Sequence, residues 1–223
     1  MEIVLKGLTK EFDNKKTNSK VVAVNNVTID IASGTLVGLL GPSGCGKSTT
    51  LFMLSGLLSP TRGQIIFGDK DVTSLEPQKR GIGLVFQNYA LYPHMTVLQN
   101  ILFPLENIGM PKEDRMKRAE EVAKIVQIEN LLDRKPSELS GGQQQRVSIG
   151  RALISRPDII LADEPTGNLD SKASREIMDL LRLSNEKYGQ TIIMITHDMN
   201  LAKTADRIIT LEDGHIVKDE KIK

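Results

Sequence analysis

An eight-residue loop early in the chain, Gly41-Pro-Ser-Gly-Cys-Gly-Lys-Ser48, restricts the possible folds more than any other segment. It fits the pattern G-x-x-x-x-G-K-[ST] and stands between a strand-like run, Leu36 to Leu40, and a helix-like segment, Thr49 to Leu57. In such a strand, loop and helix unit, the glycines let successive backbone N–H groups face a polyphosphate. Lys47 then reaches the outer phosphates, and Ser48 can bind Mg²⁺. The competing interpretation is a glycine-rich turn that happens to precede a helix.

This phosphate loop, residues 41–48, predicts a continuous stretch of nucleotide contacts. We expect them from Gly41, Ser43, Gly44, Cys45, Gly46, Lys47, Ser48 and Thr49. Cys45 occupies a variable position of the pattern, so we expect it to be a small filler rather than a redox group. It is the chain's single cysteine, so no intrachain disulfide can form, which fits a reducing compartment.

Two acidic residues end a second apolar strand. Asp163 and Glu164 follow Ile159 to Ala162, and in an open α/β sheet ligands gather beyond the carboxyl ends of the strands. We therefore expect both carboxylates to face the same crevice as the phosphate loop. Asp163 is assigned to Mg²⁺, usually through its water shell, and Glu164 to orienting or deprotonating the attacking water. Alternatively, the pair only caps the turn at Pro165.

The spacing of apolar residues predicts an α/β fold. The first forty residues are strand-like around a polar hairpin turn at 13–20, with strands expected at 3–8, 21–24, 27–31 and 35–40. Further on, strands at 159–162, 191–195 and 207–211 alternate with a helix at 171–186, which indicates a parallel sheet flanked by helices. Between about 88 and 155 the pattern indicates a helical lobe, with one helix opening at Pro111.

A glycine pair stands in the segment Leu139-Ser-Gly-Gly-Gln143. Ser140 and Gln143 have the S-x-x-Q spacing of a capping box, which predicts the start of a helix. Gly141 and Gly142 are not explained by that box, because glycine costs roughly 1 kcal/mol relative to alanine within a helix. Bare backbone N–H groups at a helix N-terminus bind anions, so the glycines suggest that a phosphate approaches closely.

Charge and hydropathy exclude several function classes. Lys and Arg total 29 and Asp and Glu total 28, so the formal net charge is +1 and no general attraction to nucleic acid or anionic lipid exists. No apolar run approaches the roughly 18 to 20 residues that a membrane-spanning helix needs. No signal peptide is visible at the N-terminus, so the cytosol is the expected compartment.

Together, the phosphate loop, Leu139 to Gln143 and the Asp163-Glu164 pair, in this order, resemble the nucleotide-binding subunit of ATP-binding cassette (ABC) transporters. The resemblance covers nearly the whole chain and implies an ATPase that uses ATP and Mg²⁺. It implies an α/β fold with a P-loop NTPase core, an N-terminal antiparallel β subdomain and an inserted α-helical subdomain. We expect residues 1–223 to form one ATPase domain, with the core and β subdomain at about 1–87 and 156–223 and the helical subdomain at about 88–155.

The resemblance assigns four further residues. Gln87 resembles the Q-loop glutamine that links Mg²⁺ and the attacking water to the helical lobe, and His197 resembles the switch histidine that contacts the γ-phosphate. Asp170 lies in a segment that resembles the D-loop, and Phe12 is placed to stack on adenine. Without the resemblance, Gln87 would be interpreted as a strand end and His197 as a helix cap. Phe12 would then be equally well interpreted as a core residue or as a ligand contact.

The resemblance also implies partners. Two such domains pack head to tail, so that the phosphate loop of one and Ser140 to Gln143 of the other enclose each ATP. The second subunit would be another copy of this chain or a paralogous ATPase. An integral membrane transporter subunit would dock near Tyr89 to Met95, where aromatic residues and Met gather, although ordinary packing of the helical lobe is an alternative. We expect a cytoplasmic protein, peripheral on the inner face of the cell membrane, without a nucleic-acid partner.

Two subfamily signals conflict. The segments 80–87 and 89–94 look like ATPases of sugar-import systems, which usually carry a further C-terminal domain. The segment 162–170, the loop near 15–20 and the short C-terminus instead resemble the macrolide-export, lipoprotein-release and cell-division branch, which we favour.

Two other functions compete: a non-transport ABC ATPase that acts on nucleic acid, and a module that binds ATP without turnover. The lack of a sustained heptad between Ser48 and Leu139 disfavours a chromosome-maintenance ATPase, and the single cassette disfavours a ribosome-associated one. Glu164 disfavours a module without turnover.

Overall fold

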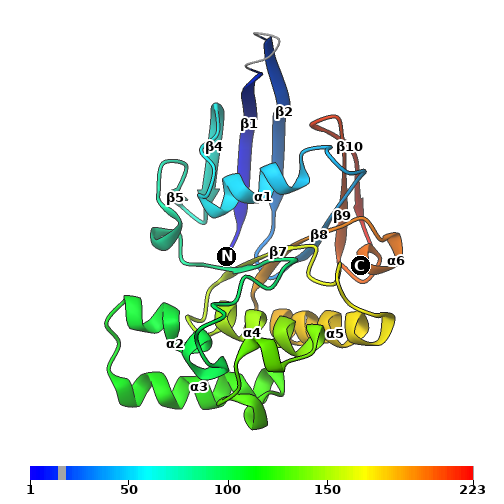
Figure 1. The fold of residues 1–223 in the computed structure, drawn as a ribbon. Helices are drawn as coiled ribbons and strands as arrows, with labels where there is room; N and C mark the ends of the chain where they lie inside the picture. Colours follow the sequence, from blue (N-terminus) through cyan, green and yellow to red (C-terminus); the bar gives the residue numbers. More distant parts are fainter. Residues whose placement is uncertain (15–18, 223) are drawn as a thin grey trace.

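A six-stranded sheet forms the centre of the computed structural model, which describes residues 1–14 and 19–222 (Figure 1). Its strand order is β10-β9-β3-β8-β7-β6. The five strands from β9 to β6 are parallel, and β10 pairs antiparallel with β9 at one edge. The strands are β3 (Leu36–Leu40), β6 (Ile82–Val85), β7 (Ile159–Asp163), β8 (Thr191–Thr196), β9 (Arg207–Glu212) and β10 (His215–Lys221). The expected mostly parallel sheet is therefore confirmed.

Both faces of this sheet are covered, which explains its continuous apolar strands. Every residue of β3 and β8 is buried. On β7, Ile160 and Ala162 belong to the core beneath the helical lobe, whereas Ile159 and Leu161 belong to the core shared with α1 and the N-terminal strands. The strand alternation therefore divides the interior into two apolar layers, one on each face.

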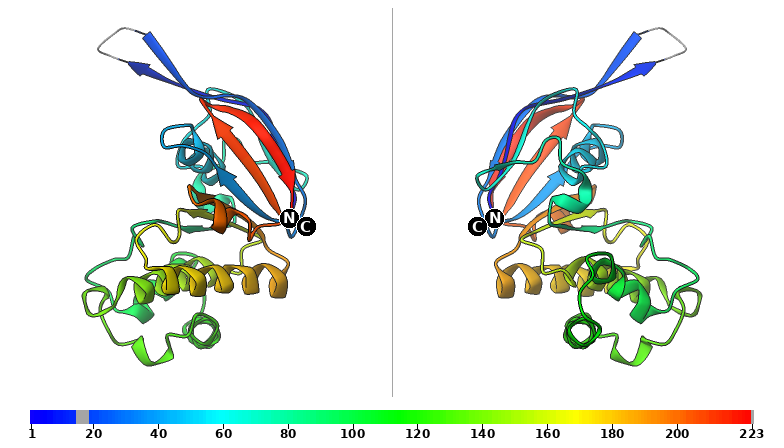
Figure 2. Two further views of the ribbon diagram at one scale, coloured as in Figure 1. Left: turned by 90° about the vertical axis from the view of Figure 1, so that its right-hand side faces the viewer. Right: turned by 90° about the vertical axis from the view of Figure 1, so that its left-hand side faces the viewer.

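A second, antiparallel sheet packs over one face, with the strand order β2-β1-β4-β5. It consists of β1 (Ile3–Asn14), β2 (Ser19–Ile31), β4 (Arg62–Phe67) and β5 (Lys70–Asp71). The two strands expected at 21–24 and 27–31 are one strand, β2, which bends at Asn26, a residue with φ of 51°. The far ends of β1 and β2 project beyond the rest of the molecule (Figure 2). The hairpin turn expected at 13–20 lies partly outside the described residues.

The helices occupy two sides of the central sheet. The first, α1 (Lys47–Ser55), lies on the side of the antiparallel sheet, and the helical lobe lies on the other with α5 (Figure 1). The lobe consists of α2 (Val97–Asn107), α3 (Lys112–Val126) and α4 (Gly141–Leu153). The remaining helices are α5 (Ser171–Tyr188) and α6 (Met199–Ala202), and short 3₁₀ turns span Pro77–Lys79, Glu129–Leu131 and Pro136–Glu138. Within the described part of the chain, no helix combines the length and the apolar composition that a membrane crossing requires.

Helix α1 has the expected length but begins and ends two residues before the expected segment 49–57, because glycines in the left-handed conformation stand at both of its ends. These are Gly46, with φ of 103°, and Gly56, with φ of 80°. The C-terminal carbonyls of α1 are bound by Arg80, whose Nη1 donates to the carbonyl oxygens of Met53 and Leu54 at 2.8 and 2.9 Å. Burial lowers the pKa of Arg80. A buried cation therefore completes the helix that follows the phosphate loop.

Parallel pairing brings the ends of four strands to one edge of the sheet. Leu40 pairs with Thr196, Asp163 with Ile195, and Val85 with Ala162. The residues that follow β3, β6, β7 and β8 include the phosphate loop, Gln87, Glu164 and His197. The register of the sheet therefore places these predicted site segments side by side.

Candidate active site

The phosphate loop needs glycine where it passes close to neighbouring backbone. A Cβ atom at Gly46 would overlap the carbonyl oxygen of Ala23 on β2, and one at Gly41 would overlap the carbonyl oxygen of Leu211. Cys45 is 3% exposed, and its Sγ lies 2.7 Å from the position of a Gly41 Cβ atom. The backbone of the loop is therefore closely packed at Gly41 and Gly46, and the small Cys45 side chain is buried against it, as expected of a filler.

Lys47 reaches back over this loop. Its Nζ donates hydrogen bonds to the carbonyl oxygens of Gly41 and Pro42 at 2.9 and 2.7 Å, and the residue is only 6% exposed. The loop also connects to β7, because Ser48 Oγ donates to the Asp163 carboxylate at 3.2 Å. The cation and the hydroxyl predicted to bind phosphate and metal thus stand beside the first predicted carboxylate.

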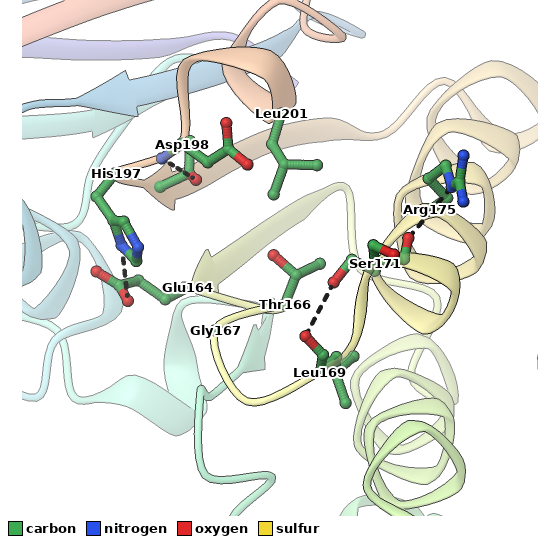
Figure 3. A pocket seen from close by; sticks show the side chains of 11 residues that line it. Glu164, Thr166, Gly167, Leu169, Ser171, Arg175, His197, Asp198 and Leu201 are labelled. Carbon is green, nitrogen blue, oxygen red and sulfur yellow. Dashed lines mark hydrogen bonds and ion pairs between the residues drawn. The ribbon is translucent and has the colours of Figure 1, made fainter.

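The two carboxylates differ in their surroundings. Burial raises the pKa of Asp163 above its usual range, while the hydrogen bond from Ser48 acts in the opposite direction. Glu164 has φ of 43°, a left-handed conformation that costs a non-glycine residue about 1 to 3 kcal/mol. Its carboxylate lies 3.3 Å from His197 Nδ1 (Figure 3). The alternative that these acids only cap the turn at Pro165 does not account for these contacts.

A cavity of about 540 Å³ opens beside Glu164 and His197. Figure 3 shows Glu164 and His197 on one side of it, Arg175 of α5 on the other, and Thr166 between them. The side chain of His197 is 68% exposed, whereas that of Glu164 is 23% exposed. The carboxylate is therefore half-buried and the imidazole exposed, and a ligand in the cavity can reach both.

Gln87 lies against the loop that follows Glu164. The side chain of Asn168 donates to the carbonyl oxygen of Gln87 at 3.0 Å. A Cβ atom at Gly167 would stand only 2.7 Å from Gln87 Nε2, so the Gln87 side chain lies directly against this glycine. The structure thus brings Gln87 next to the residues after β7.

Ser140 begins α4 with the predicted capping box. Its Oγ accepts from the backbone N–H of Gln143 at 3.3 Å, and Gln143 Oε1 accepts from the backbone N–H of Ser140 at 3.0 Å. The structure gives a reason for glycine at position 141 that the sequence did not indicate. A Cβ atom there would stand 2.7 Å from the hydroxyl of Tyr89. Gly142 has only an ordinary contact, with Ala173.

This signature turn, residues 140–143, is separate from the phosphate loop of the same chain. It lines a hollow of about 310 Å³ with Asn168, Asp170 and neighbouring residues of α5, and no residue of 41–48 is among those lining it. Asp170 caps α5 by accepting from the backbone N–H groups of Lys172 and Ala173 at 2.9 and 2.8 Å, which lowers its pKa. One chain alone therefore does not bring the two glycine-rich elements together.

Phe12 is 42% exposed, so it is not a core residue. It pairs with Val21 on β2, two residues before Ala23, whose carbonyl oxygen contacts the phosphate loop. The Nζ of Lys10 lies 5.2 Å from the centre of the Phe12 ring. An exposed aromatic face thus stands on the strand pair that packs against the loop.

Within the segment 89–95, Ala90 and Tyr92 line a groove of about 440 Å³ together with Phe103 of α2 and Arg151 of α4. Tyr92 lies 4.6 Å from Phe103 between ring centres. Tyr89 and Ala90 have φ of 62° and 50°, and Arg151 donates to their carbonyl oxygens at 3.1 and 2.6 Å. Sequence reasoning missed Arg151, because a lone cation in a helix gives no signal of the backbone it binds.

Comparisons with known proteins agree on one family. The sequence model described as ABC transporter matches residues 24–167. The Fe(3+) ions import ATP-binding protein FbpC 1 of Rhizobium meliloti (strain 1021) is 43% identical over 97% of this chain and 60% of its own length. The sn-glycerol-3-phosphate import ATP-binding protein UgpC of the same organism is 47% identical over 94% of this chain and 60% of its own length. This chain thus spans about 60% of the length of these curated relatives.

Solved structures are similar over their whole length. The dimeric structure of MJ0796, a bacterial ABC transporter cassette, has a TM-score of 0.90 and 42% identity, covering 99% of both chains. The dimeric post-hydrolysis state of the MJ0796 cassette, bound to ADP and Pi, has a TM-score of 0.89 and 39% identity, again covering 99% of both chains.

Proposed function

This chain belongs to the ABC transporter family as an ATP-binding subunit, and from that premise we propose that it binds ATP with Mg²⁺ and hydrolyses the ATP to power a membrane transporter. The main support is the meeting of Lys47, the Ser48–Asp163 contact and the Glu164–His197 pair at one edge of the sheet. On this proposal, residues 1–223 act as one ATPase domain. Residues of about 1–87 and 156–223 hold the nucleotide, and about 88–155 form the helical subdomain.

The nucleotide would lie along the phosphate loop. The N–H groups around Gly44, Gly46 and Thr49 face the phosphates, and the Lys47 ammonium exchanges its carbonyl partners for phosphate oxygens. Gly41, Ser43 and Cys45 shape the loop from within the same stretch. Phe12 would stack on the adenine ring, because it presents an exposed aromatic face beside the loop.

The residues present fit Mg²⁺. Ser48 and Asp163 bring a hydroxyl and a carboxylate oxygen within 3.2 Å, and Mg²⁺ prefers one or two protein oxygens together with phosphate and water. Within residues 1–14 and 19–222, no group of three or more His, Cys, Asp or Glu residues could hold a metal ion by itself. Ser48, Asp163 and Gln87 would hold Mg²⁺, which neutralises charge on the phosphates when bound.

Hydrolysis needs a base beside the γ-phosphate. In the proposed step, a water oxygen bonds to the γ-phosphorus, the bond from that phosphorus to the β,γ-bridging oxygen breaks, and Glu164 takes the water proton. His197 contacts the γ-phosphate and stays close to Glu164, which positions the carboxylate. The left-handed backbone of Glu164 supports this role, because such strain gathers at functional sites.

A second subunit would complete the site. Since the signature turn lies away from the phosphate loop of its own chain, the turn of a partner would cover the ATP. Ser140, Gly141, Gly142 and Gln143 supply N–H groups at the start of α4, and Asp170 caps the adjoining α5 beside them. The MJ0796 cassette is dimeric, which supports a head-to-tail pair made by two copies of this chain or by a paralogous ATPase.

A cytoplasmic helix of an integral membrane transporter subunit would dock near Tyr89 to Met95, where Ala90 and Tyr92 line the groove described above. This contact would place the chain in the cytoplasm, on the inner face of the membrane, without a nucleic-acid partner. The curated relatives named above are import proteins, which favours the importer-like signal of Arg80 to Gln87 over the export branch. The membrane protein that co-purifies with the chain would decide between import, export and signalling.

Phosphate release from ATP tests the proposal in the isolated chain. Lys47→Ala should lose ATP binding, and Glu164→Gln should bind ATP while its turnover falls by roughly 10²- to 10⁴-fold. Normal turnover by Lys47→Ala would refute the phosphate-loop assignment. An unmodified chain that binds ATP but releases no phosphate at saturating Mg²⁺ would favour a non-hydrolysing regulatory module.

A further inference from the structure

Gln145 of α4 lies between two loops of the candidate active site. The glutamine loop, residues 86–90, carries Gln87, and the acidic loop, residues 164–169, begins at Glu164. We propose that Gln145 is a positioning residue that holds these loops at a fixed spacing, so that the side chains of Gln87 and Glu164 lie beside the same phosphate group. This inference rests on the proposed function and adds a residue to it.

One amide group bridges the two loops. Gln145 is fully buried, at 0% exposed. Its Nε2 donates to the carbonyl oxygen of Pro165 at 2.7 Å and lies 3.5 Å from the carbonyl oxygen of Phe86. Phe86 directly precedes Gln87, and Pro165 directly follows Glu164. The amide therefore binds the backbone one residue away from each of the two side chains that it positions.

The loops also contact each other directly, so a change in one is passed to the other. Asn168 of the acidic loop donates to the carbonyl oxygen of Gln87 at 3.0 Å, and Gly167 packs against the Gln87 side chain. Glu164 keeps a left-handed backbone, which persists only where its surroundings fix it. The hydrogen bond from Gln145 to the carbonyl oxygen of Pro165 is one of the contacts that fix this backbone.

The same helix holds the other end of the glutamine loop. Arg151 donates to the carbonyl oxygens of Tyr89 and Ala90, and α4 itself starts at the signature turn. A shift of α4 therefore moves both ends of the glutamine loop together with the acidic loop. Contact between the signature turn and a partner's nucleotide is thereby passed to Glu164 through Gln145.

Gln145 is poorly explained by packing alone. Its Oε1 is buried and finds no hydrogen-bond partner among residues 1–14 and 19–222, and the same holds for Ser148 Oγ one turn further along α4. An unpaired buried oxygen lowers stability, and a methionine of the same length removes that penalty, which offsets the loss of the donor to the buried Pro165 carbonyl. What methionine lacks is the N–H donor to Pro165, so Gln145→Met separates the positioning role from the packing role.

The experiment measures phosphate release by the full chain with Mg²⁺ and ATP, alongside ATP affinity by fluorescent-nucleotide titration. For Gln145→Met we expect kcat to fall by about tenfold or more, while the Kd for ATP stays within about threefold and the melting temperature changes little. The matched control is Ser148→Ala, which removes the other unpartnered buried group of the same helix and should leave kcat unchanged. Dividing turnover by the nucleotide-bound fraction corrects for any unfolded protein, and Gln145→Leu repeats the comparison if the methionine variant folds poorly.

A kcat within about twofold of the unmodified chain for Gln145→Met or Gln145→Leu would overturn the positioning role. An equal loss of kcat in Ser148→Ala would also overturn it, because general disturbance of α4 would then explain both effects. Lys47→Ala, assayed in parallel, separates this failure from failure of the proposed function. If Lys47→Ala is inactive while Gln145→Met turns over normally, only the role of Gln145 fails.

Discussion

Replacing Arg80 with methionine should destabilise the whole domain, because this residue binds the C-terminal end of the helix that follows the phosphate loop. Its guanidinium donates to four carbonyl oxygens, those of Thr73 and Leu75 as well as Met53 and Leu54 of α1, at 2.8 to 3.0 Å. Methionine keeps the apolar stem but has no donor. The carbonyl group of Leu54 would then lose this donor, and that of Met53 would keep only the backbone N–H of Gly56, at 3.2 Å.

The size of the effect follows from the two buried bonds. A hydrogen bond to a charged group contributes about 1.5 to 3 kcal/mol, so losing the bonds to Met53 and Leu54 should cost about 3 to 6 kcal/mol. The carbonyl groups of Leu75 and Thr73 are partly buried and can regain water, so they add little. For a domain of this length, 1 kcal/mol corresponds to about 2 to 4 °C in melting temperature. Arg80→Met should therefore melt about 6 to 24 °C lower.

The assay is thermal unfolding followed by circular dichroism, with Lys79→Met as the matched control. Lys79 precedes Arg80 but its side chain is 66% exposed, and it pairs with the 70% exposed Glu76 at 3.2 Å. Such a surface pair contributes well under about 1 kcal/mol, so its loss should change the melting temperature by less than about 3 °C. A melting temperature for Arg80→Met within about 2 °C of the unmodified chain would refute the reasoning.

Three further substitutions test other parts of the site. Burial raises the pKa of Asp163, so its contribution to stability is complete below the ordinary carboxyl pKa and is lost as pH rises through the raised value. Without Mg²⁺ or nucleotide, Asp163→Asn should therefore melt at a higher temperature at pH 7, and its melting temperature should depend less on pH. An unchanged pH profile would argue against the raised pKa. Gly46→Ala should abolish nucleotide binding in a titration, because its methyl group overlaps the carbonyl of Ala23, and normal affinity would show that the loop tolerates it. Ser140→Ala should lose about 1 kcal/mol in urea unfolding by removing the cap on Gln143, whereas Ser140→Asn should lose less; equal losses would exclude the capping explanation.

Much of the fold could be predicted because its signals are local. The phosphate loop, the apolar strands β3, β7 and β8, and the Ser140–Gln143 capping box each lie within a few residues of sequence. Strands β4, β5 and β10 were missed, since β10 is mostly exposed and β5 has only two residues. Such strands form because a neighbouring strand pairs with them, and the amino-acid pattern alone does not indicate it.

The motifs of the candidate site could be predicted, but the side chains that hold its loops and helices in place could not. The contact between Ser48 and Asp163 follows from the parallel sheet, which the sequence indicates. Arg80, Gln145 and Arg151 instead bind backbone carbonyls from segments distant in the sequence, and any carbonyl accepts such a bond. The residue type therefore says nothing about the partner. The glycine at 141 was expected to serve a phosphate, and it also makes room for Tyr89 within the chain.

The most direct test of the central claim is the mass of Glu164→Gln in solution, measured by light scattering with and without Mg²⁺ and ATP. If ATP joins the phosphate loop of one copy to the signature turn of another, the mass should rise from 24.6 kDa to about twice that value, and Lys47→Ala should not respond. A Glu164→Gln chain that is saturated with ATP and still has a mass of 24.6 kDa would contradict the account.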